Sequence, residues 1–264
     1  MENSQFWGFY ALLAVRYMVI AGLAFLVFYM LFASRFSGRK IQVLFPKRKD
    51  YVREVGYSFL TFFTFALVGV VLASPAVLPH TRIYHRIADY GWGYLALSVV
   101  LALLIHDTYF YWTHRLMHHP RLFRLFHLTH HRSVNPSPWA AFAFSPPEAV
   151  VEASVILVIA FLIPIHSLGI LLFLLFMTVY NVYGHLGYEV YPAWLVRSRV
   201  GRWLNTSTNH NMHHRYFRGN YGLYFRFWDE LLHTTHPEYG ETLDRLVRQP
   251  EQRPATQQQY KQKG

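Results

Sequence analysis

The sequence contains no cysteine, which excludes disulfide bonds and any metal site built on thiolates. Charged residues are scarce as well: they make up 15% of the chain, against about 25% in an ordinary soluble domain. In their place, 53% of the residues are hydrophobic and 18% are aromatic. This balance argues against an ordinary soluble domain and favours a protein embedded in a membrane.

The apolar residues gather in four long runs. A membrane-spanning helix needs about 20 residues, so the first three runs are long enough to cross a bilayer. The fourth breaks near Pro164 into two limbs of roughly 15–17 residues, which predicts a short or re-entrant hairpin. The sequence therefore predicts an all-α integral membrane protein with about four to five transmembrane helices. The runs cover residues 6–33, 57–78, 91–105 with a continuation to 112, and 149–183.

The first run is too long, and its leader too acidic, for a cleaved signal peptide, so we expect it to remain as a helix. The chain carries a formal net charge of +11. Its basic residues cluster beside the apolar runs, at 35–40 and 46–50 and again at 197–202. That placement favours contact with lipid headgroups over binding to nucleic acid, and we expect no nucleic-acid partner.

The density of Lys and Arg over 35–53 predicts that this loop is cytoplasmic. The third run then returns the chain to the cytoplasm at residue 114, and a hairpin over 149–183 begins and ends on one side. The sequence thus predicts a multi-pass membrane protein with a helical cap on its cytoplasmic face. The membrane would be the inner membrane of a bacterium, or the endoplasmic reticulum of a eukaryotic cell.

Histidines dominate this expected cap. Two boxes of the form His-x-x-His-His occupy 127–131 and 210–214, and a third cluster, HRLMHH, occupies 114–119. Neutral imidazole is a metal ligand at physiological pH. Residues i, i+3 and i+4 share one face of a helix, so we expect the three histidines of each box to point at one spot.

The number of histidines exceeds what one metal ion needs. A structural zinc ion takes four ligands, whereas eight to ten imidazoles suit two metal ions. Ligand type alone leaves zinc, copper, iron and nickel open. The candidate ligands are His114, His118, His127, His130, His131, His185, His210, His213 and His214, with His119 as a further candidate.

Asp107 lies seven residues before His114, on nearly the same helical face. We expect its carboxylate to accept a hydrogen bond from a ligand histidine or from Arg115; the alternative is an interfacial aspartate paired with an arginine. For His106, which lies off that face, we expect a supporting or packing role. Single interfacial histidines without metal are expected at His80, His85, His166, His233 and His236.

Two stretches resemble the fatty acid hydroxylase/sterol desaturase superfamily, whose members are membrane-bound non-haem di-iron proteins. In 107–148, an Asp precedes YFYWTHR, His-x3-His, His-x2-His-His and a Pro-Glu that opens the next helix. In 204–236, an Asn-Thr turn precedes His-x2-His-His, Asn-Tyr-Gly and Trp-Asp. Two departures concern the substrate: Leu186-Gly187 follows His185, where many members have Ser-Asn, and His233-Thr234 stands where many have Gly-Thr.

The resemblance, which covers roughly 90–236, implies that nine of the candidate histidines bind two iron ions, with O2 as co-substrate. It implies oxidation of an unactivated C–H bond of a fatty acyl chain, sterol, aminolipid or alkylglycerol, by hydroxylation or desaturation. Trp139, Phe142 and Phe144 are candidates to line the mouth of an apolar tunnel from the bilayer, and packing is the alternative role of each. Since the chain has no dinucleotide fingerprint, haem motif or cytochrome b5-like segment, a separate ferredoxin- or cytochrome b5-like protein is expected to supply electrons.

We therefore expect transmembrane helices and a basic loop over 1–90, a catalytic domain over 91–241, and a polar, disordered tail over 242–264. The alternative function is a membrane protein that binds or transports metal through the histidines without redox chemistry. A third possibility is an inactive scaffold. Complete boxes on one side of the membrane favour the enzyme over both.

Overall fold

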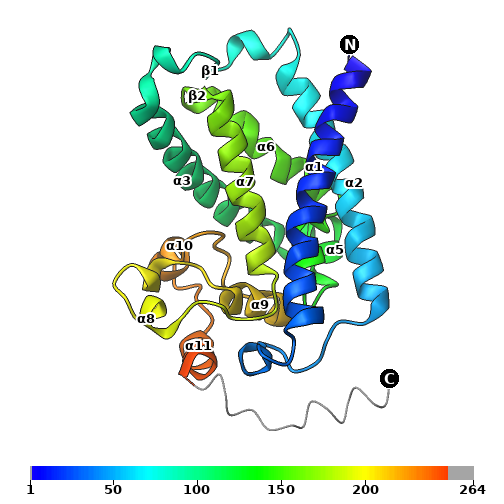
Figure 1. The fold of residues 1–264 in the computed structure, drawn as a ribbon, viewed down its shortest axis with the longest axis vertical. Coiled ribbons are helices and arrows are strands. Elements are labelled where there is room, and N and C mark those ends of the chain that lie inside the picture. The colour runs from blue at the N-terminus through cyan, green and yellow to red at the C-terminus, as the bar shows by residue number, and fades with distance from the viewer. Residues whose placement is uncertain (1, 249–264) are drawn as a thin grey trace.

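Helices form nearly all the regular structure of the protein, which a computed structural model describes over residues 2–248 (Figure 1). Among these residues, four helices are long and apolar enough to cross a membrane. The short, apolar α6 (Pro146–Leu162) accompanies them, which confirms the expected four to five helices. The four are α1 (Glu2–Phe25) with its π-helical continuation η1 (Leu26–Leu31), α2 (Arg48–Ala73), α3 (Gly91–Met117) and α7 (Ser167–Gly184).

The predicted hairpin is formed by α6 and α7. Ser145 caps the start of α6 by accepting a hydrogen bond from the Glu148 amide at 3.3 Å. Pro164 lies in the break between the helices, where its ring and missing N–H prevent a continuous helix. In this break β2 (Ile165–His166) pairs in parallel with β1 (Ile83–Tyr84), at the end of the molecule opposite the histidine boxes (Figure 1).

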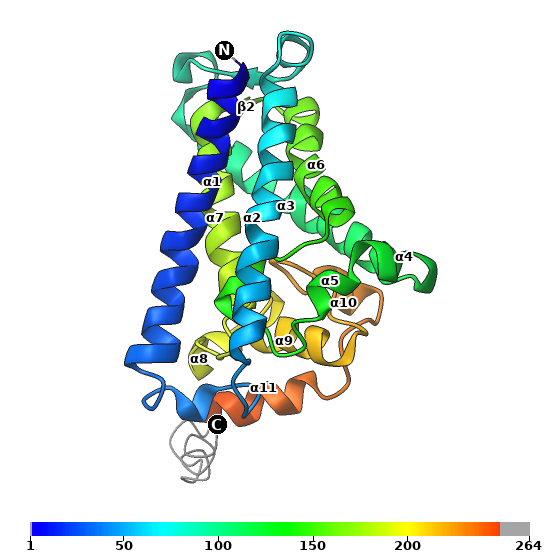
Figure 2. The same ribbon diagram turned by 90° about the vertical axis from the view of Figure 1, so that its right-hand side faces the viewer.

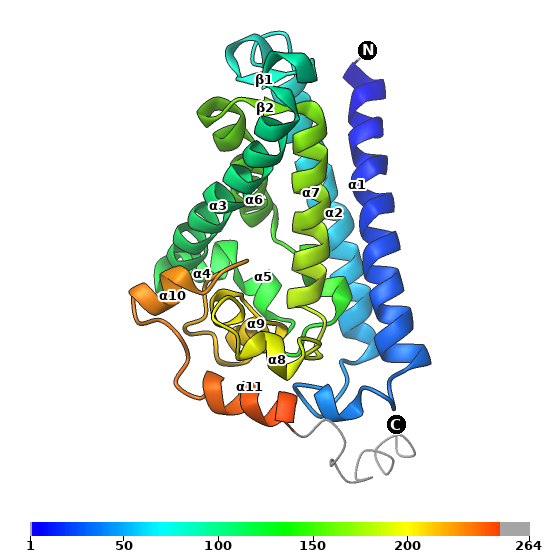
Figure 3. The same cartoon turned by 60° about the vertical axis from the view of Figure 1, so that its left-hand side comes forward.

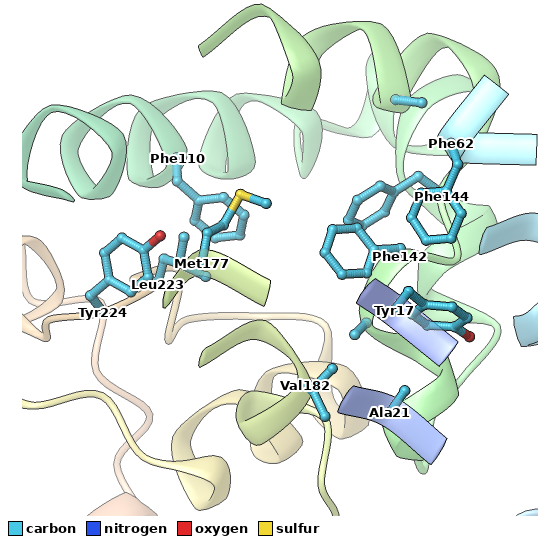
Figure 4. Packing of buried hydrophobic residues seen from close by; sticks show 12 residues of the cluster. Tyr17, Ala21, Phe62, Phe110, Phe142, Phe144, Met177, Val182, Leu223 and Tyr224 are labelled. Carbon is cyan, nitrogen blue, oxygen red and sulfur yellow. The ribbon is translucent and has the colours of Figure 1, made fainter. Parts of the chain in front are cut away.

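The N-terminal helices α1 and α2 lie side by side and pack against the rest of the bundle (Figure 2). Tyr17 and Phe62 join Phe142 and Phe144 in one part of the largest buried apolar cluster (Figure 4). Another part brings Phe110 of α3 together with residues of α7 and of the chain near Tyr224. The core therefore ties the N-terminal helices to the segments that carry the histidine boxes.

Short helices gather at one end of the bundle (Figure 3). They begin with α4 (Pro120–Phe126) and α5 (Leu128–His131), and continue with α8 (Ala193–Val196), α9 (Ser207–Tyr216), α10 (Phe227–Leu231) and α11 (Tyr239–Arg248). Single 3-10 turns complete the regular structure of the described residues: η2 (Ser37–Arg39), η3 (Leu78–His80), η4 (Ile87–Asp89), η5 (Pro138–Phe142) and η6 (Gly201–Trp203).

Helix α11 corrects the expected boundary of the polar tail. Residues 242–248 are helical, and Leu243 and Val247 pack against Met212 of α9. The polar composition hid this helix because its few apolar residues recur at helical spacing on one face only. The remainder of the predicted disordered tail, 249–264, lies outside the described residues.

Candidate metal centre

The nine principal candidate histidines form two adjacent groups. Within each group, one ring nitrogen of every member lies within 4.8 Å of those of the others. All nine are buried except His118, which is half-buried. The larger group contains five histidines and the smaller contains four. The first consists of His114, His118, His127, His131 and His213, and the second of His130, His185, His210 and His214.

Each box contributes to both groups, so the expectation that a box points at one spot is wrong. His127 and His131, at i and i+4, belong to the five-histidine group, while His130, at i+3, belongs to the other. In the second box, His210 and His214, at i and i+4, belong to the four-histidine group, while His213, at i+3, belongs to the five-histidine group. At about 100° per residue, positions i and i+4 differ by roughly 40°, whereas i+3 and i+4 differ by roughly 100°. A short helix that lies between the two groups therefore directs its i and i+4 histidines to one group and its i+3 histidine to the other.

Helix ends contribute to the arrangement. His118 follows the last residue of α3, and His127 lies at the junction of α4 and α5. In the second box, α9 starts at a Thr206 cap, which accepts from the Asn209 amide at 3.1 Å. The helix ends at Phe217, whose φ is 62°. The left-handed residue turns the chain back toward the histidines.

Three of the ring nitrogens that face away from the groups lie beside backbone carbonyls. His114 Nδ1 lies 2.9 Å from the Tyr221 carbonyl oxygen, and His213 Nδ1 lies 2.7 Å from that of Gly219. In the smaller group, His185 Nδ1 lies 2.8 Å from the Asn181 carbonyl. A carbonyl only accepts, so each of these rings donates from Nδ1 and directs an unprotonated Nε2 into its group.

The nitrogens that converge on one another could bind a metal ion. His185 Nε2 has one lone pair, yet the Nε2 atoms of His130, His210 and His214 surround it at 3.2, 3.0 and 3.2 Å. One lone pair accepts one such bond, and three N–H groups directed at it would clash. Burial also lowers the pKa of His185 to about 4, so this ring is neutral at pH 7. A metal ion bound by the four lone pairs resolves this conflict, and the donor set suits iron, zinc, copper or nickel.

The loop over 219–225 supports the five-histidine group, through His114 and His213, and explains the position of Asp107. Asp107 Oδ1 accepts hydrogen bonds from the backbone amides of Tyr224 at 2.7 Å and Phe225 at 3.1 Å. The expectation that it accepts from a histidine or from Arg115 is not met, since Arg115 donates to the Tyr111 hydroxyl instead. Asp107 therefore anchors the loop whose Tyr221 carbonyl orients His114.

A second carboxylate that the sequence analysis left without a role anchors the same loop. Asp229 accepts from the amides of Tyr221 at 2.9 Å and Gly222 at 2.8 Å. Gly219 opens the loop with φ of 71°, and a Cβ there would approach the Thr234 carbonyl oxygen to 2.5 Å. This position therefore requires glycine.

The other predicted residues lie outside the two groups. His119 is exposed and caps α4. His106 is buried, with Nδ1 2.9 Å from the Tyr224 hydroxyl, in the expected packing role. The five histidines assigned no metal role also lie outside both groups. Among the aromatic residues expected at a tunnel mouth, Trp139 and Phe142 pack against Tyr17, whereas the ring of Phe144 lies 5.1 Å from that of His130.

Glu148 received no individual role from the sequence patterns, yet its Oε1 lies 2.5 Å from His127 Nδ1. The sequence feature that could have identified Glu148 is its place in the first turn of an apolar helix, where a buried charge is costly unless it has a partner. Sequence alone did not identify that partner, because His127 belongs to a different helix.

Comparisons with known proteins agree with this site. A profile of the fatty acid hydroxylase family matches residues 99–234, just over half of the chain and including all nine histidines. A Delta(7)-sterol 5(6)-desaturase of Gibberella zeae is 32% identical over 177 residues, covering 67% of this chain and 53% of the relative. A second, from Aspergillus fumigatus, is 28% identical over 243 residues, covering 80% and 73%.

Lathosterol oxidase of Mus musculus is 31% identical over 154 residues, covering 58% of this chain and 50% of the relative. The match thus spans about half the length of the Gibberella and mouse relatives. No solved structure matches the chain. The profile match and the relatives confirm the resemblance, and the chain belongs to the fatty acid hydroxylase family.

Proposed function

We propose that the protein is a membrane-embedded di-iron oxidoreductase that uses O2 to oxidise an unactivated C–H bond of a lipid. The observation that carries the proposal is the pair of adjacent, buried, all-imidazole groups at one end of four apolar helices. Relatives named as sterol desaturases and lathosterol oxidase favour a sterol-like lipid and desaturation; hydroxylation is the other outcome.

Two iron ions, when bound, supply the activation of O2 and the oxidising power. The chain's own residues hold the two positions side by side, because each box contributes to both groups. Burial of the rings keeps water away and keeps the imidazoles neutral. Phe144, whose ring contacts His130 beside the four-histidine group, is the apolar side chain we assign to orienting the lipid.

We further propose that a separate acidic one-electron carrier docks beside the five-histidine group. The ring of Phe217 lies 4.8 Å from that of His131. Among the partly buried aromatic side chains that contact this group, it makes the shortest ring-to-ring contact. Exposed Arg215 and Arg218 lie beside Phe217 in the chain, and exposed Arg132 follows His131. Their charge favours encounter with an acidic partner.

The basic loop over 35–53 supports a cytoplasmic location for both groups. In the structure this loop contacts the segment that follows His185: the Ile41 amide donates to the Gly187 carbonyl at 3.0 Å. The histidine groups and the basic loop thus lie at the same end of the bundle. We propose that this end faces the cytoplasm.

Metal analysis and lipid mass spectrometry test the proposal. The purified protein, reconstituted in lipid, is expected to contain two irons per chain, one for each histidine group. With O2 and a reductant it should convert a lipid to a product that has gained one oxygen or lost two hydrogens. His130→Ala should abolish the product, whereas the control His119→Ala, at an exposed position outside both groups, should retain it. Zinc alone, with no product, would favour the metal-binding alternative.

A further inference from the structure

Glu148 differs from every other partner of the histidine groups. Among the described residues it is the one carboxylate that hydrogen-bonds a histidine of either group, at 2.5 Å from His127 Nδ1. The outward nitrogens of His114, His185 and His213 instead lie beside neutral backbone carbonyls. Among the described residues, one ring of the five-histidine group is therefore held by a carboxyl group, and no ring of the four-histidine group is.

The position of Glu148 is rigid. It lies in the first turn of α6, and its own amide donates to the Ser145 side chain. The Ser145 hydroxyl in turn donates to the carbonyl of Phe126 at 2.6 Å, immediately before His127. The start of α6 is thus fixed to the junction from which His127 extends, so carboxylate and imidazole are held together by backbone as well as by their own bond.

The surroundings of Glu148 offer its carboxyl group no partner other than His127 among the described side chains. The residue is 0% exposed. No lysine or arginine of residues 4–248 forms an ion pair with it, and its Oε2 has no hydrogen-bond partner within that range. A buried carboxylate is costly unless it is paired. A metal ion on His127 Nε2 supplies positive charge along the ring, and Nε2 of His127 has no other partner among the described residues.

We infer that Glu148 is a positioning residue that fixes His127 with Nδ1 protonated and Nε2 directed at the five-histidine metal, and that makes this ring a stronger donor than the other eight. A carboxylate behind a metal-bound imidazole fixes the tautomer and raises ligand basicity. The two metal ions are consequently inequivalent in donor strength as well as in ligand number. The inference rests on the proposed metal centre but is independent of the lipid substrate.

The test compares Glu148→Gln with Glu152→Gln in the full-length, reconstituted protein. Glu152 lies one turn further along α6, is nearly as buried, and makes no hydrogen bond to a histidine of either group. Loss of such a supporting partner typically weakens metal affinity by about 10–100-fold. Chelator titration of Glu148→Gln should therefore release the five-histidine metal that much more readily, with the other metal unchanged.

Spectra give a second readout that a merely structural role would not change. In 57Fe-loaded protein, Glu148→Gln should alter the Mössbauer signal of one iron and leave the second in place, while Glu152→Gln should resemble the wild type. Wild-type release and spectra in Glu148→Gln would overturn the inference. An equal change in both variants would also overturn it, because it would indicate a general disturbance of α6.

A conservative variant keeps the test decisive if Glu148→Gln does not fold. Glu148→Asp retains the charge on a shorter side chain and should hold the five-histidine metal with an affinity below that of the wild type. Wild-type affinity in Glu148→Asp would contradict the inference. If the wild-type protein binds zinc and forms no lipid product, the proposed redox function fails, yet the same titration with zinc still tests the role of Glu148.

Discussion

The division of each histidine box between two metal positions predicts that adjacent histidines act on different metals. His130 belongs to the four-histidine group and His131 to the five-histidine group. His130→Ala leaves three imidazoles for its metal, whereas His131→Ala leaves four for the other. The two substitutions remove the same side chain from neighbouring positions, so each is the natural control for the other.

The magnitude follows from the number of ligands. A four-ligand zinc site in a small peptide contributes roughly 10–16 kcal/mol of apparent binding free energy, or about 2.5–4 kcal/mol for each ligand. At about 1.4 kcal/mol per tenfold change, His130→Ala should weaken its metal by about 10²–10³-fold. His131→Ala should have a smaller effect on the other metal, because four imidazoles still complete a tetrahedral set.

The assay is chelator titration followed by metal counting and Mössbauer spectroscopy of 57Fe-loaded protein. His130→Ala should lose the four-histidine metal first, and His131→Ala the five-histidine metal. In the second box, His214→Ala should then resemble His130→Ala, and His213→Ala should resemble His131→Ala. The reasoning is refuted if His213→Ala and His214→Ala release the same metal, or if His130→Ala and His131→Ala have the same release profile.

Three further predictions concern the surface, the basic loop and the topology. The double variant Arg215→Glu/Arg218→Glu should raise KM for a reduced acidic donor protein at low salt. It should have little effect on turnover when a small chemical reductant supplies the electrons. An unchanged KM would refute the docking proposal. Burial among aromatic rings lowers the pKa of Lys40 to about 7, so the folded protein releases this proton at lower pH than the unfolded chain. Stability should therefore rise by about 2 kcal/mol between pH 7 and 9 in chemical denaturation. Lys40→Met should flatten that rise, and parallel profiles would contradict the assignment. Because the chain has no cysteine, Lys49→Cys and Arg86→Cys can be labelled selectively, and a membrane-impermeant thiol reagent outside the cell should reach only the second; labelling of the first would reverse the proposed orientation.

Several features of the fold followed from local sequence patterns. Runs of apolar residues predicted α1, α2, α3 and the α6–α7 hairpin, because a helix must satisfy its own backbone hydrogen bonds in a bilayer. The spacing of the histidines selected eight of the nine residues that the structure brings together, and the ninth, His185, was selected by its place at the exit of the hairpin. Helix α11 was missed because its apolar residues are few and its polar composition dominates any average over the segment.

The partners of individual side chains did not follow from local patterns. Asp107 contacts the amides of residues more than a hundred positions away, and its helical face alone suggested a histidine or arginine instead. His127 and Glu148 belong to different helices, and their bond depends on how the start of α6 packs beside the end of α4. Such contacts are decided by the packing of the whole bundle.

The sequence by itself determined that the chain is a helical membrane protein with a surplus of imidazole ligands and no thiolate, because composition and residue spacing act locally. Only the tertiary structure decided which histidine belongs to which group. His130 and His131 are neighbours in the chain, yet they point to different groups, since a helical turn separates their directions by roughly 100° and a different set of histidines lies on each side. Each group draws its histidines from segments that lie far apart in the sequence, so its membership depends on how those segments pack together.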